Sequence, residues 1–177
     1  NQPDIQFNVM PLSADRPGEP LHRYSGFTAA AWQCHPASRG RSDIVSSDPS
    51  KDTRIQPNYL SESIDQQTLV EGIKILRDIY KQSSFKDLWD KEIIPGSKYE
   101  TDEQILDAAK NMGGTVYHYA GTCRMGVDNA AVVDHHLRVR GVKNLRVVDA
   151  SIMPEITSAN INAPTLMIAE KAADIIL

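Results

Sequence analysis

Alternating polar and apolar positions mark the start of the chain. In DIQFNVM, residues 4–10, every second side chain is apolar, which is typical of a strand with one buried face. Residues 27–33 and 41–46 favour two further strands, because stretches rich in proline and glycine set them apart. The first part of the chain therefore predicts an antiparallel sheet.

Helical periodicity follows these strands. The segment SIDQ, residues 63–66, resembles a capping box with Ser63 as N-cap and Gln66 three residues later. Apolar side chains then recur at helical spacing: Leu69, Ile73, Leu76 and Tyr80. The segment TDEQ, residues 101–104, opens a second helix in the same way, and the glycine pair 113–114 ends it.

The last third of the chain has a different character. Residues 145–149, LRVVD, form a short apolar run that predicts a strand ending in an acid. Residues 163–177 predict an apolar helix with Pro164 in its first turn, where proline is tolerated. A strand, an acidic turn and a helix are typical of an α/β nucleotide-binding layer. We therefore expect an α+β substrate-binding domain whose C-terminal strand and helix return to a Rossmann-like α/β domain.

Composition places the protein among ordinary globular chains. Of 177 residues, 41% are hydrophobic and 24% are charged, which argues against disorder. A net charge of −4 without a basic block gives no nucleic-acid footprint. Two cysteines cannot form a disulfide framework, and no apolar run approaches the roughly 20 residues that span a bilayer. We expect a cytoplasmic protein without a transmembrane segment; peripheral membrane association and export stay open.

One ionisable side chain stands out in TVYHYAGTCRMG, residues 115–126. His118 lies between two tyrosines and before a small-residue turn, so it is either a packed core histidine or the working group of an active site. The segment 158–165 places two asparagines before a helix, and a helix N-terminus stabilises an anion. A proton-accepting imidazole, an amide and a helix end suit removal of a proton from an alcohol while a hydride leaves the carbon.

A metal site is another interpretation of His118. Cys123 and the pair His135-His136 would be the further ligands. Their spacing fits no standard zinc pattern, so we expect no metal.

Residues 117–176 resemble the C-terminal signature of the glucose–methanol–choline family of flavin oxidoreductases, especially its choline dehydrogenase and choline oxidase branch. Two pieces within this range carry the resemblance, YHYAGTCRMG and VVDHHLRVRGVKNLRVVDASIMPEITSANINAPTLMIAEKAADII. Two further pieces lie upstream of it, HPASRGRSDIVSSDP and IQPNYLS. The resemblance implies the C-terminal portion of an FAD-dependent alcohol oxidoreductase, which oxidises a small-molecule alcohol to the carbonyl compound.

The resemblance also assigns roles to particular residues. His118 aligns with the catalytic histidine, which takes the hydroxyl proton while a hydride moves to flavin N5, and Asn160 aligns with its partner. Because 42 residues separate the two, only folding can bring them together. A strand-end turn and a helix start are assigned contacts with FAD: Asp149, Ala150, Asn162, Ala163, Pro164 and Thr165.

The implied enzyme is larger than this chain. Residues 1–112 would be part of a substrate-binding domain, and residues 113–177 would carry the histidine loop and complete the FAD-binding domain. The dinucleotide fingerprint GxGxxG does not occur in these 177 residues. We expect it on an N-terminal FAD-binding segment of the same enzyme, carried by the same polypeptide, a nicked chain or a separate subunit.

Tyr119 departs from the family pattern, because many members have proline directly after the histidine. The alcohol therefore stays unassigned. Two alternative functions stay open as well. One is a hydroxynitrile lyase on the same scaffold, which moves a proton without net redox chemistry. The other is a truncated binding domain without catalytic activity.

Overall fold

The computed structural model describes residues 2–16 and 18–177. These residues form two compact units. Asn1–Ser38 and Leu60–Gly114 make up the first, which we call the sheet unit; Arg39–Tyr59 and Thr115–Leu177 make up the second, which we call the histidine unit. The division into a substrate-binding part and a cofactor-binding part after residue 112 stays a prediction.

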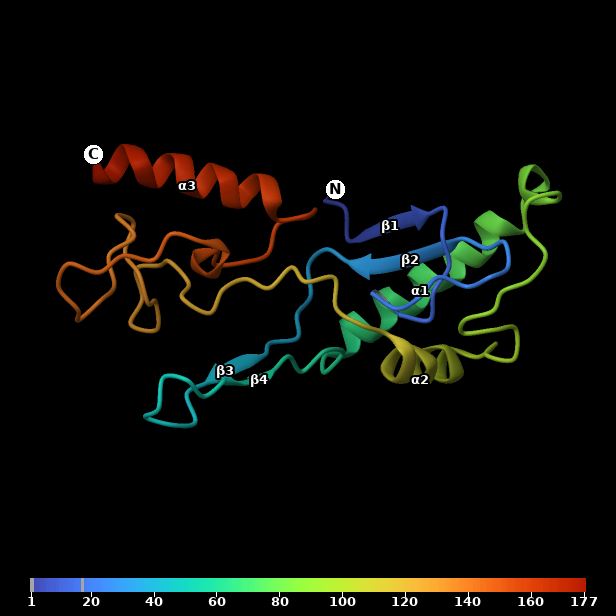
Figure 1. Ribbon diagram of the computed structural model, residues 1–177, viewed down its shortest axis with the longest axis horizontal. Helices are drawn as coiled ribbons and strands as arrows, with labels where there is room; N and C mark the ends of the chain where they lie inside the picture. Colours follow the sequence, from blue (N-terminus) through green and yellow to red (C-terminus); the bar gives the residue numbers. More distant parts are fainter. Residues whose placement is uncertain (1, 17) are drawn as a thin grey trace. The chain divides into compact units, whose positions relative to one another are not determined.

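The sheet unit consists of an antiparallel strand pair with helices beside it (Figure 1). Its elements are β1 (Ile5–Met10), β2 (Thr28–Gln33), α1 (Ser63–Tyr80), the 3-10 turn η1 (Ser83–Phe85) and α2 (Asp102–Met112). In the strand pair, Ile5 lies opposite Gln33 and Met10 lies opposite Thr28. The two strands and the two α-helices predicted for this part of the chain are confirmed.

Helix α1 approaches the strand pair closely because Gly72 has no side chain. A Cβ atom on Gly72 would lie 3.1 Å from Ile5 Cδ1 and 3.2 Å from Ala31 Cβ. On the same helix, Val70 and Leu76 are buried. Burial of side chains of this size contributes roughly 1.5–3 kcal/mol each, so the buried side chains of α1 are a main source of stability for the unit.

Helix α1 begins at Ser63, so the predicted role of Ser63 as N-cap is wrong. The N-cap is Glu62, whose side chain makes no capping hydrogen bond. The Gln66 side chain instead donates to the Leu60 carbonyl at 2.7 Å. Ser38 supports this end of the helix from a distant loop, because its hydroxyl accepts the Glu62 N–H at 3.2 Å.

Asp65 joins α1 to the end of β2. The residue is only 1% exposed, and its carboxylate accepts hydrogen bonds from Gln33 Nε2 at 2.8 Å and from the N–H groups of Ala37 and Ser38 at 2.8 and 2.7 Å. Burial alone would raise the pKa of Asp65, but the hydrogen bonds from Ser38, Ala37 and Gln33 outweigh it and lower the pKa. Asp65 is therefore a charged structural anchor.

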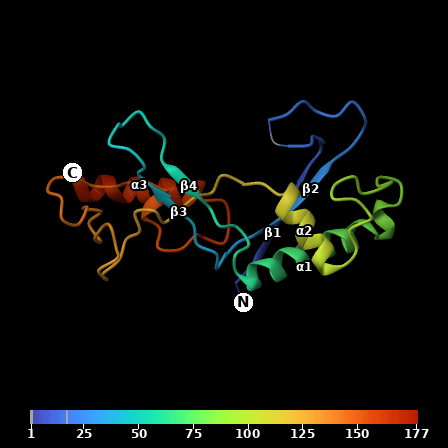
Figure 2. The same ribbon diagram turned by 90° about the horizontal axis from the view of Figure 1, so that it is seen from below.

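Helix α2 begins with the predicted capping box. Thr101 Oγ1 accepts the Gln104 N–H at 3.3 Å, and the Gln104 side chain accepts the Thr101 N–H at 3.1 Å. Ile105 and Ala108 are buried, and α2 lies against α1 (Figure 2). The helix ends at Gly113, as the sequence predicted.

Thr101→Ala is expected to lower the free energy of unfolding by about 1 kcal/mol, because the first turn of α2 loses its side-chain acceptor. Thr101→Ser keeps the hydroxyl and should retain most of the stability. Urea unfolding followed by circular dichroism measures the difference. Equal unfolding midpoints for the alanine and serine variants would contradict a capping role.

The histidine unit is less regular. Its elements are β3 (Arg41–Asp43), β4 (Arg54–Gln56), the 3-10 turn η2 (Ala150–Ile152) and α3 (Asn162–Ile176). Strands β3 and β4 form a second antiparallel pair, and β3 is shorter than the strand that the sequence predicted. The C-terminal helix is confirmed, and it packs on a core of four buried residues: Val133, Leu137, Ile152 and Ala172.

Residues 145–149 do not form the predicted strand. An isolated bridge pairs Arg138 with Arg146, and no longer ladder of hydrogen bonds includes this run within the described residues. Val147 and Val148 pack against the core of the histidine unit. The apolar run therefore reflects burial in an irregular part of the chain.

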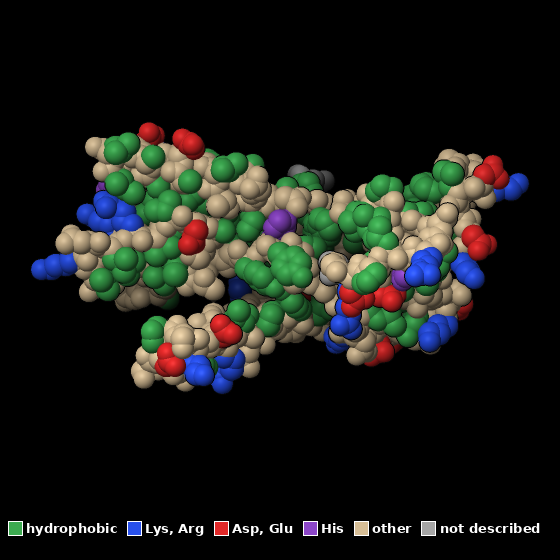
Figure 3. Space-filling model, viewed as in Figure 1, with side chains coloured by type: hydrophobic (Ala, Val, Ile, Leu, Met, Phe, Trp, Pro, Cys, Tyr) green, Lys and Arg blue, Asp and Glu red, His purple; other side chains and the backbone are tan. Residues whose placement is uncertain are grey.

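The described residues thus form an α+β fold with two small antiparallel sheets and three α-helices. Figure 3 shows hydrophobic side chains on the surface over α3. Three apolar side chains of this helix are more than half exposed: Leu166, Met167 and Ile176. None of the described helices combines the length and the apolarity needed to cross a membrane.

Candidate functional site

His118 and Asn160 meet in the histidine unit. Asn160 Nδ2 lies 2.6 Å from His118 Nε2. A side-chain amide nitrogen can only donate, so in this arrangement the imidazole nitrogen accepts. With its amide turned over, the same asparagine would accept a hydrogen bond from a protonated imidazole. The contact can therefore serve the histidine before and after it takes up a proton.

The imidazole remains open to solvent on part of its surface. His118 is half-buried, and the neighbouring Tyr117 and Tyr119 are 68% and 54% exposed. A small molecule can reach such a ring, whereas it cannot reach a histidine that is fully enclosed in a core. The structure brings together the two residues to which the sequence assigned catalytic roles; the roles themselves stay predictions.

The backbone before His118 has an unusual conformation. Tyr117 has a φ of 59°, in the left-handed region, and its N–H donates to Thr115 Oγ1 at 3.0 Å. A bulky residue in this region carries strain of roughly 1–3 kcal/mol, and it persists only where the surrounding structure imposes it. Gly121 also has a positive φ, 87°, which glycine adopts without strain.

After the histidine, the chain runs beside η2. Cys123 N–H donates to the Ser151 carbonyl at 2.9 Å, and Met125 N–H donates to the Ile152 carbonyl at 2.8 Å. Ile152 belongs to the buried core, and Met125 packs against it. The downstream end of the histidine segment is therefore fixed to the centre of the unit.

Asp149 lies at the start of η2. Its carboxylate accepts the Ser151 N–H at 2.8 Å and also bonds to the Ser151 hydroxyl. Asp149 thus caps η2, and Ala150 is the first residue of that turn. This role accounts for an acid at this position without a ligand, so contact of Asp149 and Ala150 with FAD stays a prediction.

The start of α3 has no side-chain cap among the described residues. The N-cap is Ile161, so Asn162 and Ala163 are the first helical residues, followed by Pro164. The Thr165 N–H and hydroxyl both donate to the Ile161 carbonyl, at 3.0 and 2.7 Å. Helix N–H groups without a capping side chain suit an anionic group, and this end of α3 follows Asn160 directly in sequence.

Two tyrosine hydroxyls belong to the same surroundings: that of Tyr119, which the sequence marked as a departure from the family pattern, and that of Tyr59, which it did not single out. Hydrogen bonding with Thr115 and then with Tyr59 lowers the pKa of Tyr119. Desolvation is the main cause of the raised pKa of Tyr59. Tyr59 lies in the matching piece IQPNYLS, which was the one signal that could have identified it.

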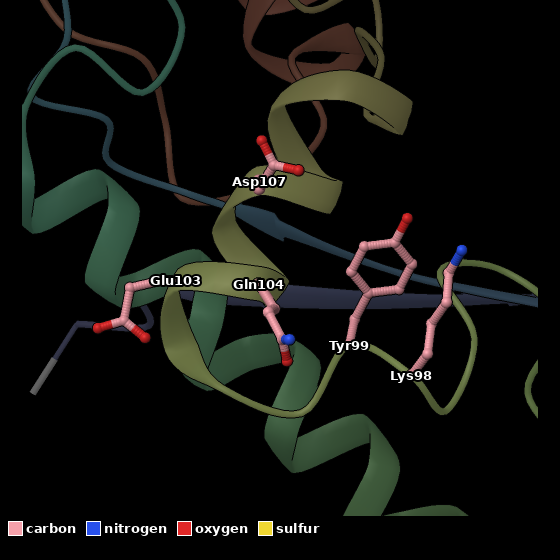
Figure 4. Close-up of a pocket in the computed structure, with 5 residues that line it drawn as sticks. All are labelled: Lys98, Tyr99, Glu103, Gln104 and Asp107. Atoms are coloured by element: carbon pink, nitrogen blue, oxygen red, sulfur yellow. The ribbon is translucent and has the colours of Figure 1, made fainter.

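A surface hollow in the sheet unit contains none of the predicted site residues. Figure 4 shows its lining, which consists of Lys98, Tyr99 and three side chains of α2: Glu103, Gln104 and Asp107. The hollow has two carboxylates and neither an imidazole nor a thiol. The chemistry of the histidine unit therefore has no counterpart there.

The chain is similar to known proteins over its whole length. A family model described as GMC oxidoreductase matches residues 36–169. An alcohol dehydrogenase [acceptor] from Pseudomonas putida is 44% identical over 177 residues, which is 100% of this chain and 32% of the relative. An oxygen-dependent choline dehydrogenase from Paraburkholderia xenovorans is 40% identical over 172 residues, 97% of this chain and 31% of the relative.

Solved structures lead to the same group of proteins. The crystal structure of pyridoxine 4-oxidase from Mesorbium loti superposes with a TM-score of 0.87 at 32% identity, over 98% of this chain and 34% of that protein. A formate oxidase from Aspergillus oryzae gives a TM-score of 0.84 at 27% identity, over 99% of this chain and 31% of that protein. The chain spans about a third of the length of the curated relatives it matches.

Proposed function

Because the chain belongs to the GMC oxidoreductase family, we propose that it supplies the catalytic histidine of an FAD-dependent alcohol oxidoreductase. The observation that carries this proposal is the 2.6 Å contact between His118 and Asn160, just before α3. Relatives named alcohol dehydrogenase and choline dehydrogenase support an alcohol as the substrate.

In this proposal His118 acts as the general base. On binding, a substrate hydroxyl would replace Asn160 as the donor to the single lone pair of His118 Nε2, and an N–H of the Asn160 amide would turn to the substrate oxygen. The hydroxyl proton moves to Nε2, and Asn160 then accepts a hydrogen bond from the imidazolium through its carbonyl oxygen. General base assistance of this kind contributes roughly 10²–10⁴-fold to the rate.

The residues at the start of α3 fit the proposed cofactor. When bound, FAD would accept the hydride that leaves the carbinol carbon. The uncapped N–H groups of Asn162 and Ala163, at the positive end of the helix, would stabilise negative charge on it. We assign supporting contacts to Pro164 and Thr165 in the same turn and to the η2 start at Asp149 and Ala150.

The exposed side of α3 supports a further domain. Leu166 and Met167 are 59% and 60% exposed, and a helix that is apolar on more than one face is normally covered by protein. We propose that this part of the chain, residues 113–177, completes a Rossmann-like FAD-binding domain. The GxGxxG segment would supply the rest of that domain, and residues 1–112 would belong to the substrate side.

Turnover of alcohols by the FAD-loaded enzyme tests the proposal. Primary alcohols with and without a quaternary ammonium group are incubated with an artificial electron acceptor, and the carbonyl product is measured. We expect one substrate class to give product together with reduction of the acceptor. Cyanide release from a cyanohydrin without reduction of the acceptor would favour the lyase alternative. No turnover by protein with bound FAD would favour the binding domain.

A further inference from the structure

The residue before His118 has a conformation that its side chain disfavours. Tyr117 has a φ of 59°, whereas a glycine would adopt this backbone without strain. The ring of Tyr117 gains little from burial in return, because the residue is 68% exposed. Something other than packing of this side chain must therefore hold the backbone.

The Thr115 hydroxyl is the group in position to do so. Its oxygen accepts the Tyr117 N–H at 3.0 Å, which closes a tight turn two residues long. The turn ends directly at His118. A change in the Tyr117 backbone would change the direction in which the chain continues to His118. The imidazole would then move away from Asn160, whose Nδ2 lies 2.6 Å from His118 Nε2.

Directly after the histidine, the Tyr119 side chain is hydrogen-bonded to Thr115 and Tyr59, and the fixed points of the downstream backbone lie farther away. Cys123 and Met125 are bonded to the backbone of η2 and the residues around it, five and seven residues after His118. Between them and the histidine lies Gly121, whose backbone is permissive. The restraint on the backbone that lies closest to the imidazole is therefore the upstream one.

We infer that Thr115 is a positioning residue: by accepting the Tyr117 N–H, it fixes the peptide plane before Tyr117. The strained turn at Tyr117 then cannot relax by rotation of that plane, and His118 stays aimed at Asn160. This inference rests on the proposed function, because its kinetic consequence requires that His118 take the substrate proton. The threonine touches neither substrate nor cofactor in this account and acts only through the orientation of the histidine.

The test compares variants of the FAD-loaded enzyme in steady-state alcohol oxidation. Thr115→Val keeps the side-chain shape and removes the acceptor of the Tyr117 N–H, together with the hydrogen bonds of the hydroxyl to Tyr119 and Tyr59. We expect kcat to fall about 10-fold with little change in KM. Adding Tyr117→Asn should recover most of the loss, because asparagine tolerates the left-handed region. Thr53→Val makes the same substitution at an exposed threonine of the histidine unit and serves as the matched control.

A second measurement does not depend on turnover. The ¹⁵N resonance of His118 Nε2 reports its hydrogen bond to Asn160, and it should shift in Thr115→Val and return in the double variant. If the wild-type enzyme oxidised no alcohol, the proposed function would be wrong. The resonance of His118 Nε2 would then still test whether Thr115 positions the histidine. Active wild type with equal kcat and equal resonances in Thr115→Val and Thr53→Val would overturn the inference. A loss that Tyr117→Asn does not reverse would overturn it as well.

Discussion

His118→Ala is expected to lower kcat for alcohol oxidation by roughly 10²–10⁴-fold while FAD stays bound, because the substrate hydroxyl loses its proton acceptor. His118→Gln sharpens the result. Glutamine can keep a hydrogen bond to Asn160 but cannot take up the proton, so the glutamine variant should be nearly as slow as the alanine variant. Steady-state kinetics at saturating alcohol, with the flavin content measured by absorbance, provide the data.

The matched control for His118 is His135→Ala. His135 is an exposed histidine of the same unit, and its ring lies against His136 rather than against Asn160. We expect the control to keep the wild-type kcat. If His118→Gln turned over alcohol as fast as His135→Ala, the histidine would not be the base, and its contact with Asn160 would need a structural explanation.

Asp65→Ala is expected to lower the free energy of unfolding by about 3–5 kcal/mol. The substitution removes the acceptor for Gln33 Nε2 and for the N–H groups of Ala37 and Ser38, in surroundings where the aspartate is only 1% exposed. Each buried donor that is left without a partner destabilises the folded state by its full desolvation free energy. Denaturant unfolding of the purified protein measures the loss.

A control variant and the pH dependence of stability both test the stabilising role of the Asp65 carboxylate. Asp87→Ala, at an exposed position, should change the stability by less than about 0.5 kcal/mol. Hydrogen bonds lower the folded-state pKa of Asp65, so its contribution is present above the unfolded pKa of about 3.9 and is lost as the pH falls through the folded value. The stability gap between wild type and Asp65→Ala should therefore narrow below about pH 4. A gap that stays constant with pH would show that the carboxylate charge is not involved.

Two similar sequence patterns show how far local prediction reaches in this fold. The TDEQ segment forms the predicted capping box, because Thr101 and Gln104 find their partners within one helical turn. The SIDQ segment does not, because distant residues take over: Ser38 accepts the Glu62 N–H, and Asp65 bonds to the loop after β2. Local patterns predict an element well, and they fail where long-range polar contacts satisfy the backbone.

The prediction of a strand at residues 145–149 was wrong for a related reason. Burial selects apolar residues whether the backbone joins a ladder or not, and Val147 and Val148 are packed in an irregular segment. The prediction of the candidate site did not come from local patterns. The pairing of His118 with Asn160 across 42 residues came from family resemblance, not from spacing, and the two side chains are in contact in the structure. The left-handed backbone of Tyr117 and its bond to Thr115 have no signature in the sequence.

The central claim is that this chain provides the proton acceptor for oxidation of an alcohol by FAD. The most direct test is to mix the FAD-loaded enzyme with its alcohol in the absence of oxygen and follow the flavin absorbance in wild type and in His118→Gln. We predict rapid bleaching of the wild-type flavin and bleaching slowed by roughly 10²-fold or more in the variant. Equal bleaching rates would contradict the account.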